Sequence, residues 1–457
     1  MTSPQDLLAA HVAGTRTVPP AVAAKVKTFL LDTLGVGIAG SSGAGVEALV
    51  ALARSWGPGD EATAWLGGER LSAGSAAIVN AYQIHCLEFD CVHEGAVLHP
   101  MATVLSAVLA WAERESGRGA PVAGRDLLAA LAVGIDVSCL LGLAANGPIR
   151  FFRPATAGGF GACAAICNLA RLGESQVKDA FGAQYAQTSG TLQPHVEGSP
   201  MLGMQVAFNA RAAIQATDLA RAGVRGPHDV FTGPYGYLTL WEGDDHDLPA
   251  LLPGLGRDWQ VLAMSHKPFP SGRLTHGTVT GLMRLRAAHG FRADDVEHVL
   301  AEVPPLPFRL TGRPDIPDPA PNYAKLCTRF VAATYLLRGR VDVPDFLGES
   351  LRDPALHALA ARVEVRQSDE PDPNAFDPQR VTVTLRDGRV LTTEVTRAFG
   401  HPDDPLTEAQ NVEKFRRCLG HARRPVPEAQ ADALVAAVAG LEALSDVAVL
   451  ARLARAA

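Results

Sequence analysis

The first 250 residues carry helical spacing of apolar residues and show no strand pattern, which constrains the fold more than any other feature. Near the start, apolar residues recur at Val22, Val26, Phe29, Leu30 and Leu34. This is the spacing that one buried helix face requires. Further helical segments are expected at 71–90, 101–115, 126–143, 177–188 and 206–222. Helices with apolar faces must pack on one another, so this half predicts a large all-helical domain.

The pattern changes near Ser265. The segment SHKPFPSGRLTHGT holds two prolines and a Ser-Gly pair, a cluster typical of a domain boundary. Strand patterns follow at 296–303, 363–366, 381–385 and 390–395. Asp387-Gly388, between the last two, is a strong hairpin signal. An Ala-rich helical run then closes the chain at 427–456.

These boundaries predict a mainly α protein. A large all-helical domain is expected from residues 1–262 plus 400–457, because the last segment matches the first half in composition. A smaller α+β domain, at 263–399, is inserted between them. The length of 457 residues agrees with two or three domains.

Composition excludes several classes of function. The net charge of -7 and the lack of a basic stripe argue against a nucleic-acid partner. The N-terminus lacks a charged region followed by an apolar core, so we expect no secretory signal. The most apolar window, 127–145, is interrupted by Asp136 and Ser138, which favours a buried helix over a membrane span. Seven cysteines at scattered spacing favour a reduced, cytoplasmic protein.

Two motifs have simpler explanations than the chemistry they suggest. Gly35, Gly37 and Gly40 spell GxGxxG, but a helix precedes them where a dinucleotide site needs a strand. We therefore expect these glycines to allow close helix packing. Cys163 and Cys167 lie four residues apart without a second ligand pair nearby, and are interpreted as packing residues of a helix.

Acid–base groups are concentrated between residues 80 and 113. Six such residues fall within fifteen positions of a chain that is only 19% charged: His85, Glu88, Asp90, His93, Glu94 and His99. The pattern predicts a helix to about Asp90, a loop, and a second helix that begins at Pro100. His99 would then adjoin a helix N-terminus, which favours anions, so the segment suggests a carboxylate substrate. The alternative is a set of solvated loop charges with one satisfied histidine.

Basic residues elsewhere add candidate anion contacts. Arg153 precedes a Gly-rich helix start at 158–161, although it could equally be surface charge. Lys267 lies among breaker residues at the domain boundary, where it would meet substrate if one domain closed as a lid. Arg273 and His276 fall on one helix face beyond it.

Several segments occur together in an order that resembles the MmgE/PrpD family. They are LDTLGVGIAG at 31–40, HCLEFDCVHEGAVLHP at 85–100, GGFGACAA at 158–165, SHKPFPSGRLTH at 265–276 and PDDPLTEAQNVEKFRRC at 402–418. The family includes 2-methylcitrate dehydratase, cis-aconitate decarboxylase and iminodisuccinate epimerase. The resemblance implies a helical domain with an inserted α+β lid, an active site between them, a homodimer, and no metal or organic cofactor.

The chain departs from the family pattern at several positions. Where the family usually reads Asp-Phe-Asp-Asp-Thr, this chain has Glu88-Phe89-Asp90-Cys91-Val92. A histidine ahead of the Gly-rich helix is replaced by Phe152, or by Arg153 with a one-residue slip. A lysine and a tyrosine of the family fall nearest to Leu202 and Phe330. Asp90, His99, Lys267 and His276 match the pattern.

The resemblance and the residue chemistry together predict a site. Catalytic roles are expected for His99, Lys267, Asp90 and His276, although Asp90 and His276 could instead orient a neighbour. Substrate contacts are expected from Arg273, Arg153, Ser271, Glu88 and His93. His99 and Lys267 should face one cleft, one from each domain, and that cleft should be net positive.

The reaction itself stays open between four possibilities. Dehydration of a 2-methylcitrate-like acid comes first, from the resemblance. Epimerisation beside a carboxylate needs fewer groups and tolerates the departures better. Decarboxylation of a cis-aconitate-like acid ranks below both, because it uses several of the replaced positions. The fourth possibility is a carboxylate-binding relative without activity.

Overall fold

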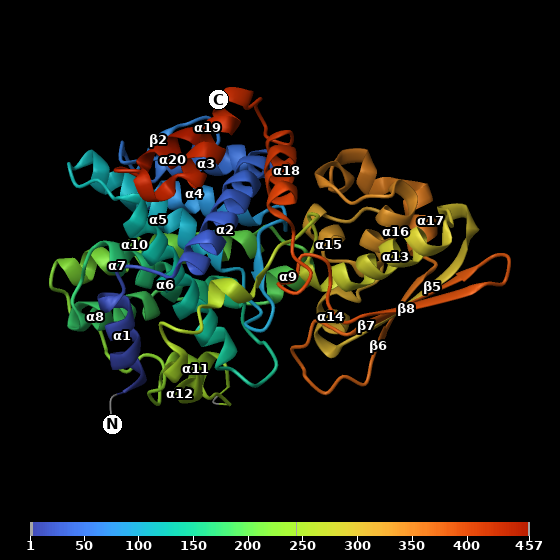
Figure 1. Cartoon of the computed structure of the whole chain (residues 1–457), viewed down its shortest axis with the longest axis horizontal. Coiled ribbons are helices and arrows are strands. Elements are labelled where there is room, and N and C mark those ends of the chain that lie inside the picture. The colour runs from blue at the N-terminus through green and yellow to red at the C-terminus, as the bar shows by residue number, and fades with distance from the viewer. Residues whose placement is uncertain (1–2, 244, 456–457) are drawn as a thin grey trace.

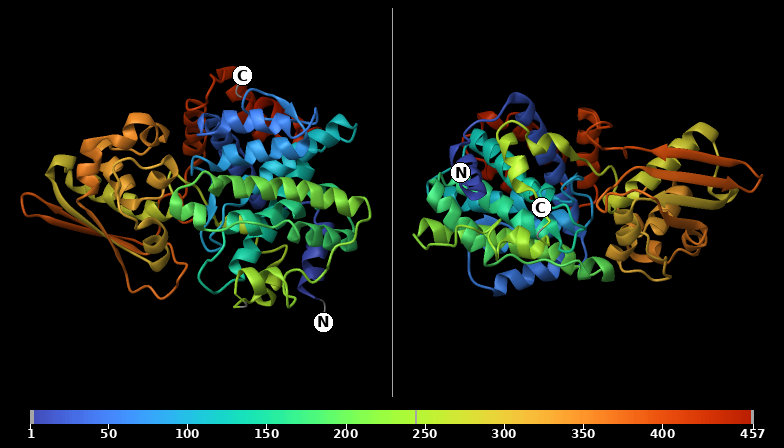
Figure 2. Two further views of the ribbon diagram at one scale, coloured as in Figure 1. Left: turned by 180° about the vertical axis from the view of Figure 1, so that it is seen from behind. Right: turned by 90° about the horizontal axis from the view of Figure 1, so that it is seen from below.

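The structure, a computed structural model that describes residues 3–243 and 245–455, consists of two lobes (Figure 1). Helices build the larger lobe, and both described chain ends lie on it. The smaller lobe contains the four-stranded sheet with helices on one side (Figure 2). The mainly α class is thus confirmed.

Twelve helices precede residue 252 in the described chain. They are α1 (Pro4–Gly14), α2 (Pro20–Ala39), α3 (Val46–Ser55), α4 (Ala73–His85), α5 (Pro100–Gly117), α6 (Gly124–Leu143), α7 (Arg153–Leu169), α8 (Glu174–Tyr185), α9 (Gln193–Glu197), α10 (Met201–Arg221), α11 (Tyr237–Trp241) and α12 (Leu248–Leu251). Helices α4, α5, α6 and α7 are buried on nearly every face, as expected when helices form the interior of a large core. Their apolar side chains join in one continuous cluster.

The chain after residue 400 packs back onto this core. It forms α18 (Glu408–Leu419), α19 (Glu428–Ala439) and α20 (Ala448–Leu453). Helix α18 lies along α2, and Phe415 and Leu434 belong to the same buried cluster as the first half of the chain. The larger lobe therefore draws on both parts of the sequence.

The smaller lobe has a core of its own around a four-stranded sheet. Its strands are β5 (Val296–Val303), β6 (Val363–Gln367), β7 (Gln379–Leu385) and β8 (Val390–Val395), in the order β6-β5-β7-β8. Only the β5–β6 pair is parallel. The helices are α13 (His276–His289), α14 (Pro305–Thr311), α15 (Pro321–Lys325), α16 (Thr328–Arg338) and α17 (Pro354–Ala360).

The four predicted strands are confirmed, as is the hairpin at Asp387-Gly388. Gly388 has φ +87°, a left-handed conformation that glycine adopts without strain. The buried residues Val381, Val383 and Leu385 of β7 alternate with less buried polar residues, so register follows from burial of one face.

The prediction of a strand-free first half is wrong in detail. Three two-residue strands occur there: β1 (Ala62–Thr63), β2 (Arg70–Leu71) and β3 (Val92–His93). The last pairs antiparallel with β4 (Met264–Ser265), and this bridge joins the segment after α4 to the boundary between lobes. Two residues are too few to leave an alternation in the sequence.

The GxGxxG segment lies within and just after α2, as the packing interpretation expects. A Cβ on Gly40 would fall 1.8 Å from the carbonyl oxygen of Gln83, so α2 and α4 approach too closely there for any other residue. The dinucleotide motif is therefore a packing motif.

The apolar window and the cysteines also belong to the core. Among the described residues, α6 is the one helix that alone is long and apolar enough to cross a membrane, and 89% of its most apolar window is buried within the protein. All seven cysteines are buried and unpaired, and the sulfurs of Cys163 and Cys167 lie 4.0 Å apart along α7.

An ion pair buried between α2 and α18 generates a testable prediction. The Lys414 ammonium lies 2.6 Å from Asp32 and donates to the carbonyl of Phe89 at 3.1 Å. Lys414→Met should lower the free energy of unfolding by about 3 kcal/mol or more, because it leaves a buried carboxylate unpaired. Urea unfolding followed by circular dichroism measures the change. The double variant Asp32→Leu/Lys414→Met should recover most of the loss; equal losses in both variants would contradict the pairing argument.

Candidate active site

A pocket of about 530 Å³ lies between the two lobes, with walls from both. Its polar wall residues are Glu88, His99, His195, Arg273 and Thr311. The rest is mainly apolar: Val92, Val97, Ile149, Phe152, Pro154, Leu192, Leu274, Leu310, Leu326 and Phe376. Several of these form a small hydrophobic cluster distinct from the core of either lobe.

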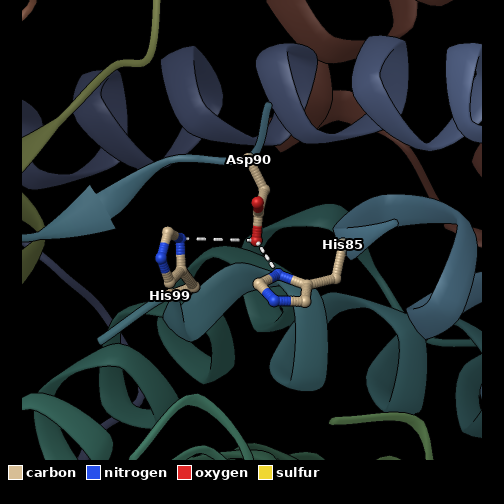
Figure 3. A group of neighbouring side chains, drawn as sticks. All are labelled: His85, Asp90 and His99. Atoms are coloured by element: carbon tan, nitrogen blue, oxygen red, sulfur yellow. Dashed lines mark hydrogen bonds and ion pairs between the residues drawn. The ribbon is translucent and has the colours of Figure 1, made fainter. Parts of the chain in front are cut away.

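The loop between α4 and α5 supplies the acid–base groups. Helix α4 ends at His85, five residues earlier than expected, and His99 is the N-cap residue of α5. Pro100 occupies the first helical turn, as predicted. Asp90 lies between the two imidazole rings (Figure 3). Its carboxylate accepts from His85 Nδ1 at 2.9 Å and lies 3.6 Å from His99 Nδ1.

His99 presents a proton acceptor to the pocket. Its Nδ1 lies 3.1 Å from the carbonyl oxygen of Cys91, which can only accept, so Nδ1 carries the proton and Nε2 has the free lone pair. Burial, and then the ammonium of Lys267, lower the pKa of His99 to about 4. The neutral ring is therefore the state available near neutral pH.

His195, on α9, presents the opposite tautomer. Its Nδ1 lies 3.0 Å from a guanidinium nitrogen of Arg313, which can only donate. The proton of the neutral ring must then be on Nε2. Burial and Arg313 lower the pKa of His195 to about 3, so the ring stays neutral. The pocket wall thus holds one imidazole that accepts and one that donates.

Asp90 and Glu88 share one buried cation. The Lys267 ammonium donates to Glu88 at 2.9 Å and lies 3.8 Å from Asp90. Burial opposes the ionisation of both carboxyl groups. Lys267 and His85 nevertheless hold the pKa of Glu88 below its ordinary value. His85 and His99 likewise hold the pKa of Asp90 below its ordinary value. Burial also opposes the charge on His85, whose pKa is nonetheless raised by Asp90 and Glu88.

The pairing of β3 with β4 explains how Lys267 reaches this cluster. Val92 pairs with Ser265, so the residues that flank the two strands come together although about 170 positions separate them. Glu88 lies in the pocket wall, whereas Lys267 is fully buried behind it. Lys267 therefore does not line the cleft as expected, and acts on it through Glu88.

Backbone strain also accompanies the pocket. Within the described chain, Glu88, Val97 and Arg171 are the non-glycine residues with φ between +53° and +54°. Glu88 and Val97 both line the pocket. Such conformations persist where the surrounding structure fixes them, and they cluster at functional sites.

Arg273 lies in the wall but its donors are already used. Its Nε donates to Glu94 at 2.8 Å, and its terminal nitrogens donate to the carbonyls of His266, Ala398 and Phe399. The expected role as a carboxylate clamp is therefore weakened, because Glu94 compensates the charge and four of the five N–H groups already donate to the protein. Through its bonds to Ala398 and Phe399, Arg273 instead holds the segment near residue 399 against the site.

Arg153 lies elsewhere. Its guanidinium is 2.9 Å from Glu242 and donates to the carbonyls of Ala96 and Gly142, all in the interior of the larger lobe. The expected contact with substrate does not agree with this position. The preceding residue, Phe152, takes the place in the pocket wall.

Three further candidates serve the structure around the site. His93 accepts from the Ala96 backbone and pairs with Gln260. His276 stacks on Phe269 at 3.9 Å and donates to the carbonyl of Ser271 at 3.3 Å. The Ser271 hydroxyl pairs with Thr275. None lines the pocket, so the structure places His93, His276 and Ser271 as supports of their neighbours.

Lys267 and Arg273, two of the cations expected to make the cleft net positive, are compensated by carboxylates of the protein. Lys267 faces two carboxylates, so its cluster is neutral only when His85 carries a proton, and negative otherwise. Arg273 is neutralised by Glu94. Buried charges are stable only when paired, and here the protein supplies the partners itself.

Two residues of the site were absent from the predicted set. His85 belongs to the segment in which acid–base residues are concentrated, so that concentration could have indicated it as a site residue. His195 lies in a short helix with no surrounding motif, and no pattern in the sequence singles it out.

The atoms of His85, Asp90 and His99 could in principle hold a metal ion, since their nearest ligand atoms lie within 4.8 Å of one another (Figure 3). The Lys267 ammonium 3.8 Å from Asp90 already supplies a cation at this point. A divalent ion would have to overcome that repulsion, so the set fits a hydrogen-bonded cluster better than a metal centre.

Sequence comparison agrees with the fold and the order of these segments. The MmgE/PrpD N-terminal domain matches residues 6–248, and the MmgE/PrpD C-terminal domain matches residues 269–440. The chain belongs to the MmgE/PrpD family. Its resemblance to that family, expected from five short segments, is thereby confirmed.

Relatives within the family carry two kinds of name. Cis-aconitate decarboxylase of Mus musculus is 26% identical over 93% of this chain and 88% of its own. A cis-aconitate decarboxylase-like protein of Aspergillus oryzae is 27% identical over 88% of this chain and 86% of its own. The mitochondrial 2-methylcitrate dehydratase of Yarrowia lipolytica is 31% identical, but over 32% of this chain and 29% of its own.

Two departures from the family pattern lie in the pocket wall. Val92 stands there in place of the usual threonine, and Phe152 is one of the two positions, with Arg153, that match the usual histidine. Leu202 and Phe330 belong instead to the hydrophobic cores of the larger and the smaller lobe. The pocket is therefore more apolar than the family pattern implies.

The buried histidines predict how stability depends on pH. His93, His99 and His195 have pKa values of about 4, 4 and 3. Their ordinary value is about 6.5, so unfolded chains take up protons that the folded chain does not. The stability that depends on them is complete above pH 6.5 and is lost as the pH falls toward 4, by up to about 1.4 kcal/mol per pH unit for each histidine.

Urea unfolding at pH 7.5, 6.0 and 5.0 measures this slope. His93→Gln should make the slope shallower, because it removes one buried neutral imidazole. The exposed residue His289 offers a matched control, His289→Gln, which should leave the slope unchanged. Identical slopes for all three proteins would contradict the assignment.

Proposed function

We propose that the protein is an enzyme, a cofactor-independent lyase that dehydrates a small hydroxycarboxylic acid. The observation that carries this proposal is the pair of neutral histidines in one pocket, with His99 as the acceptor and His195 as the donor. Elimination of water needs a base for the proton at carbon and a donor for the charge that develops. Membership of a family that contains a named dehydratase supports the same reaction.

In this mechanism His99 Nε2 takes the proton from the carbon next to a carboxylate. The imidazolium that forms lies 3.6 Å from Asp90, which stabilises its charge, while the Cys91 carbonyl holds the ring in its tautomer. The carbon–oxygen bond at the next carbon then breaks, and the departing hydroxyl, held by the Nε2–H of His195, takes the proton back from His99 and leaves as water. Lys267 keeps His99 neutral beforehand, and is therefore a positioning residue rather than a catalytic one.

The pocket also supports a substrate class. The cations Lys267 and Arg273 are paired with carboxylates within the protein, and much of the pocket wall is apolar. A multiply charged acid would lose its hydration without compensation. We therefore propose an acid with fewer charges than a tricarboxylate, which places an apolar substituent against Ile149, Leu274 and Leu310.

Decarboxylation of an unsaturated acid is the second candidate. The relatives that match nearly the whole chain are named cis-aconitate decarboxylases, whereas the named dehydratase matches a third of it. The same two histidines could serve this reaction, with a protonated His99 supplying the proton at carbon. An epimerase of the iminodisuccinate type is the third candidate, and a carboxylate-binding relative without activity is the fourth.

The wider proposals rest on the family alone. They are a homodimer, a cytoplasmic location, action without metal or organic cofactor, and a lid function for the smaller lobe. The pocket between the lobes supports the last of these, since a movement of either lobe would open or close it.

The reaction is tested by incubating the protein with carboxylic acids in deuterated water. The panel pairs 2-methylcitrate and cis-aconitate with alkyl-substituted hydroxy-dicarboxylates, and products are followed by NMR and carbon dioxide release. We expect an unsaturated product that keeps all its carbon, formed faster from the less charged, alkyl-substituted acids. Carbon dioxide would favour the decarboxylase, exchange without product an epimerase, and inertness a binding protein. Efficient turnover of 2-methylcitrate would contradict the proposed substrate class.

Replacing His99 tests the base directly. His99→Gln should lower kcat/KM by about 10²- to 10⁴-fold, because it removes the proton acceptor and keeps a hydrogen-bonding side chain. His93→Gln is the matched control, since His93 is buried six residues away but outside the pocket. Equal losses in the two variants would show that His99 acts through structure alone.

Replacing Lys267 tests the positioning role. In the native enzyme the acid limb of the kcat/KM profile should lie near pH 4, the pKa of His99. Lys267→Met should move this limb upward, because Glu88 and Asp90 would then face His99 without their cation. Activity at pH 7 should fall sharply. An unchanged profile with unchanged activity would remove Lys267 from the mechanism.

A further inference from the structure

A second hollow lies beside the active site and shares no lining residue with it. This groove, of about 1080 Å³, is formed by α3, the end of α4, the start of α10 and the segment around α15. Leu52 and Met201, in its wall, are 51% and 46% exposed, which is unusual for side chains of this size. The groove therefore presents apolar surface that the described chain leaves uncovered.

One charged group faces this apolar surface. Lys325, at the end of α15, is 4% exposed and lies in the groove wall. Its ammonium donates to the carbonyl of Cys86 at 2.8 Å and to Asn322 at 3.5 Å. An ammonium has three N–H groups, so one N–H of Lys325 remains available to a further acceptor.

Lys325 differs from the other buried cations of the protein. Lys267, Lys414, Arg153 and Arg273 each pair with a carboxylate within 3 Å. Lys325 has no carboxylate within 4.0 Å in the described part of the chain. Burial, more than any neighbour, lowers its pKa, as expected for a cation without a counter-charge. An uncompensated buried ammonium is unfavourable unless an anion from outside completes it.

We propose that this groove binds an unbranched medium-chain fatty acid, with the carboxylate on Lys325 and the alkyl chain along the apolar walls. A buried cation in the wall of an apolar groove complements an anion at the end of a hydrocarbon chain. The site is separate from the active pocket, because the segment Cys86–Glu88 and Lys325 itself lie between them. The inference therefore does not depend on the proposed reaction.

Isothermal titration calorimetry with decanoate tests the proposal on the full-length protein. We expect one binding site per chain. Lys325→Met, which keeps the aliphatic stem, should weaken decanoate at least tenfold, and 1-decanol should bind the native protein at least tenfold more weakly than decanoate. His99→Gln should bind decanoate as the native protein does, which separates this groove from the active pocket.

A second variant keeps the test independent of Lys325. Ala48 is exposed in the groove wall, so Ala48→Trp should fill the groove and also weaken decanoate at least tenfold. Ala436→Trp, on the exposed face of α19, is the matched control and should bind normally. Undiminished binding in both Lys325→Met and Ala48→Trp would overturn the proposal. Equal affinity for decanol and decanoate would also overturn it. So would failure of the native protein to bind decanoate; if Ala48→Trp then lost an oligomer seen by light scattering, the groove would be an interface between copies of the chain.

Discussion

The buried cluster of Lys267, Glu88 and Asp90 is the interaction on which the rest of the site depends. Folding buries an ammonium and two carboxylates next to one another, and each buried charge is stable only while the others are present. Lys267 comes from the boundary between lobes and the carboxylates from the loop after α4. The two-residue pairing of β3 with β4 brings them together, so a small piece of sheet sets the geometry of a helical active site.

This arrangement changes how the pocket can act on an acid. Because the protein supplies carboxylates for Lys267 and Arg273, these two cations attract an acidic substrate only weakly. Selectivity then comes from directed hydrogen bonds and from shape. His99 and His195 provide these directions, since each tautomer is fixed by a partner that can only accept or only donate. The hydrophobic wall strengthens both bonds by keeping water away.

Local features of the fold were predictable from the sequence, and the pairing of charges was not. Strands β5 to β8 and the Asp387-Gly388 hairpin follow from patterns a few residues long, as does the start of α5 at Pro100. The pairing of Arg273 with Glu94 joins residues 179 positions apart. A sequence shows that both charges exist but not that they neutralise each other. Arg273 was therefore assigned to the substrate, and His195, whose partner Arg313 is also distant in the chain, was not recognised.

The same pairing bears on which reaction the site favours. Loss of carbon dioxide from a multiply charged acid requires cations that hold the remaining carboxylates while charge moves to carbon. Here those cations are compensated, and Val92 and Phe152 have replaced polar side chains in the wall. Removal of a proton by neutral His99 creates one new charge, which a neutral donor such as His195 can stabilise in a water-poor pocket without any spare cation. Under the proposed function, this difference in charge favours proton abstraction from a lightly charged acid over decarboxylation of a multiply charged one.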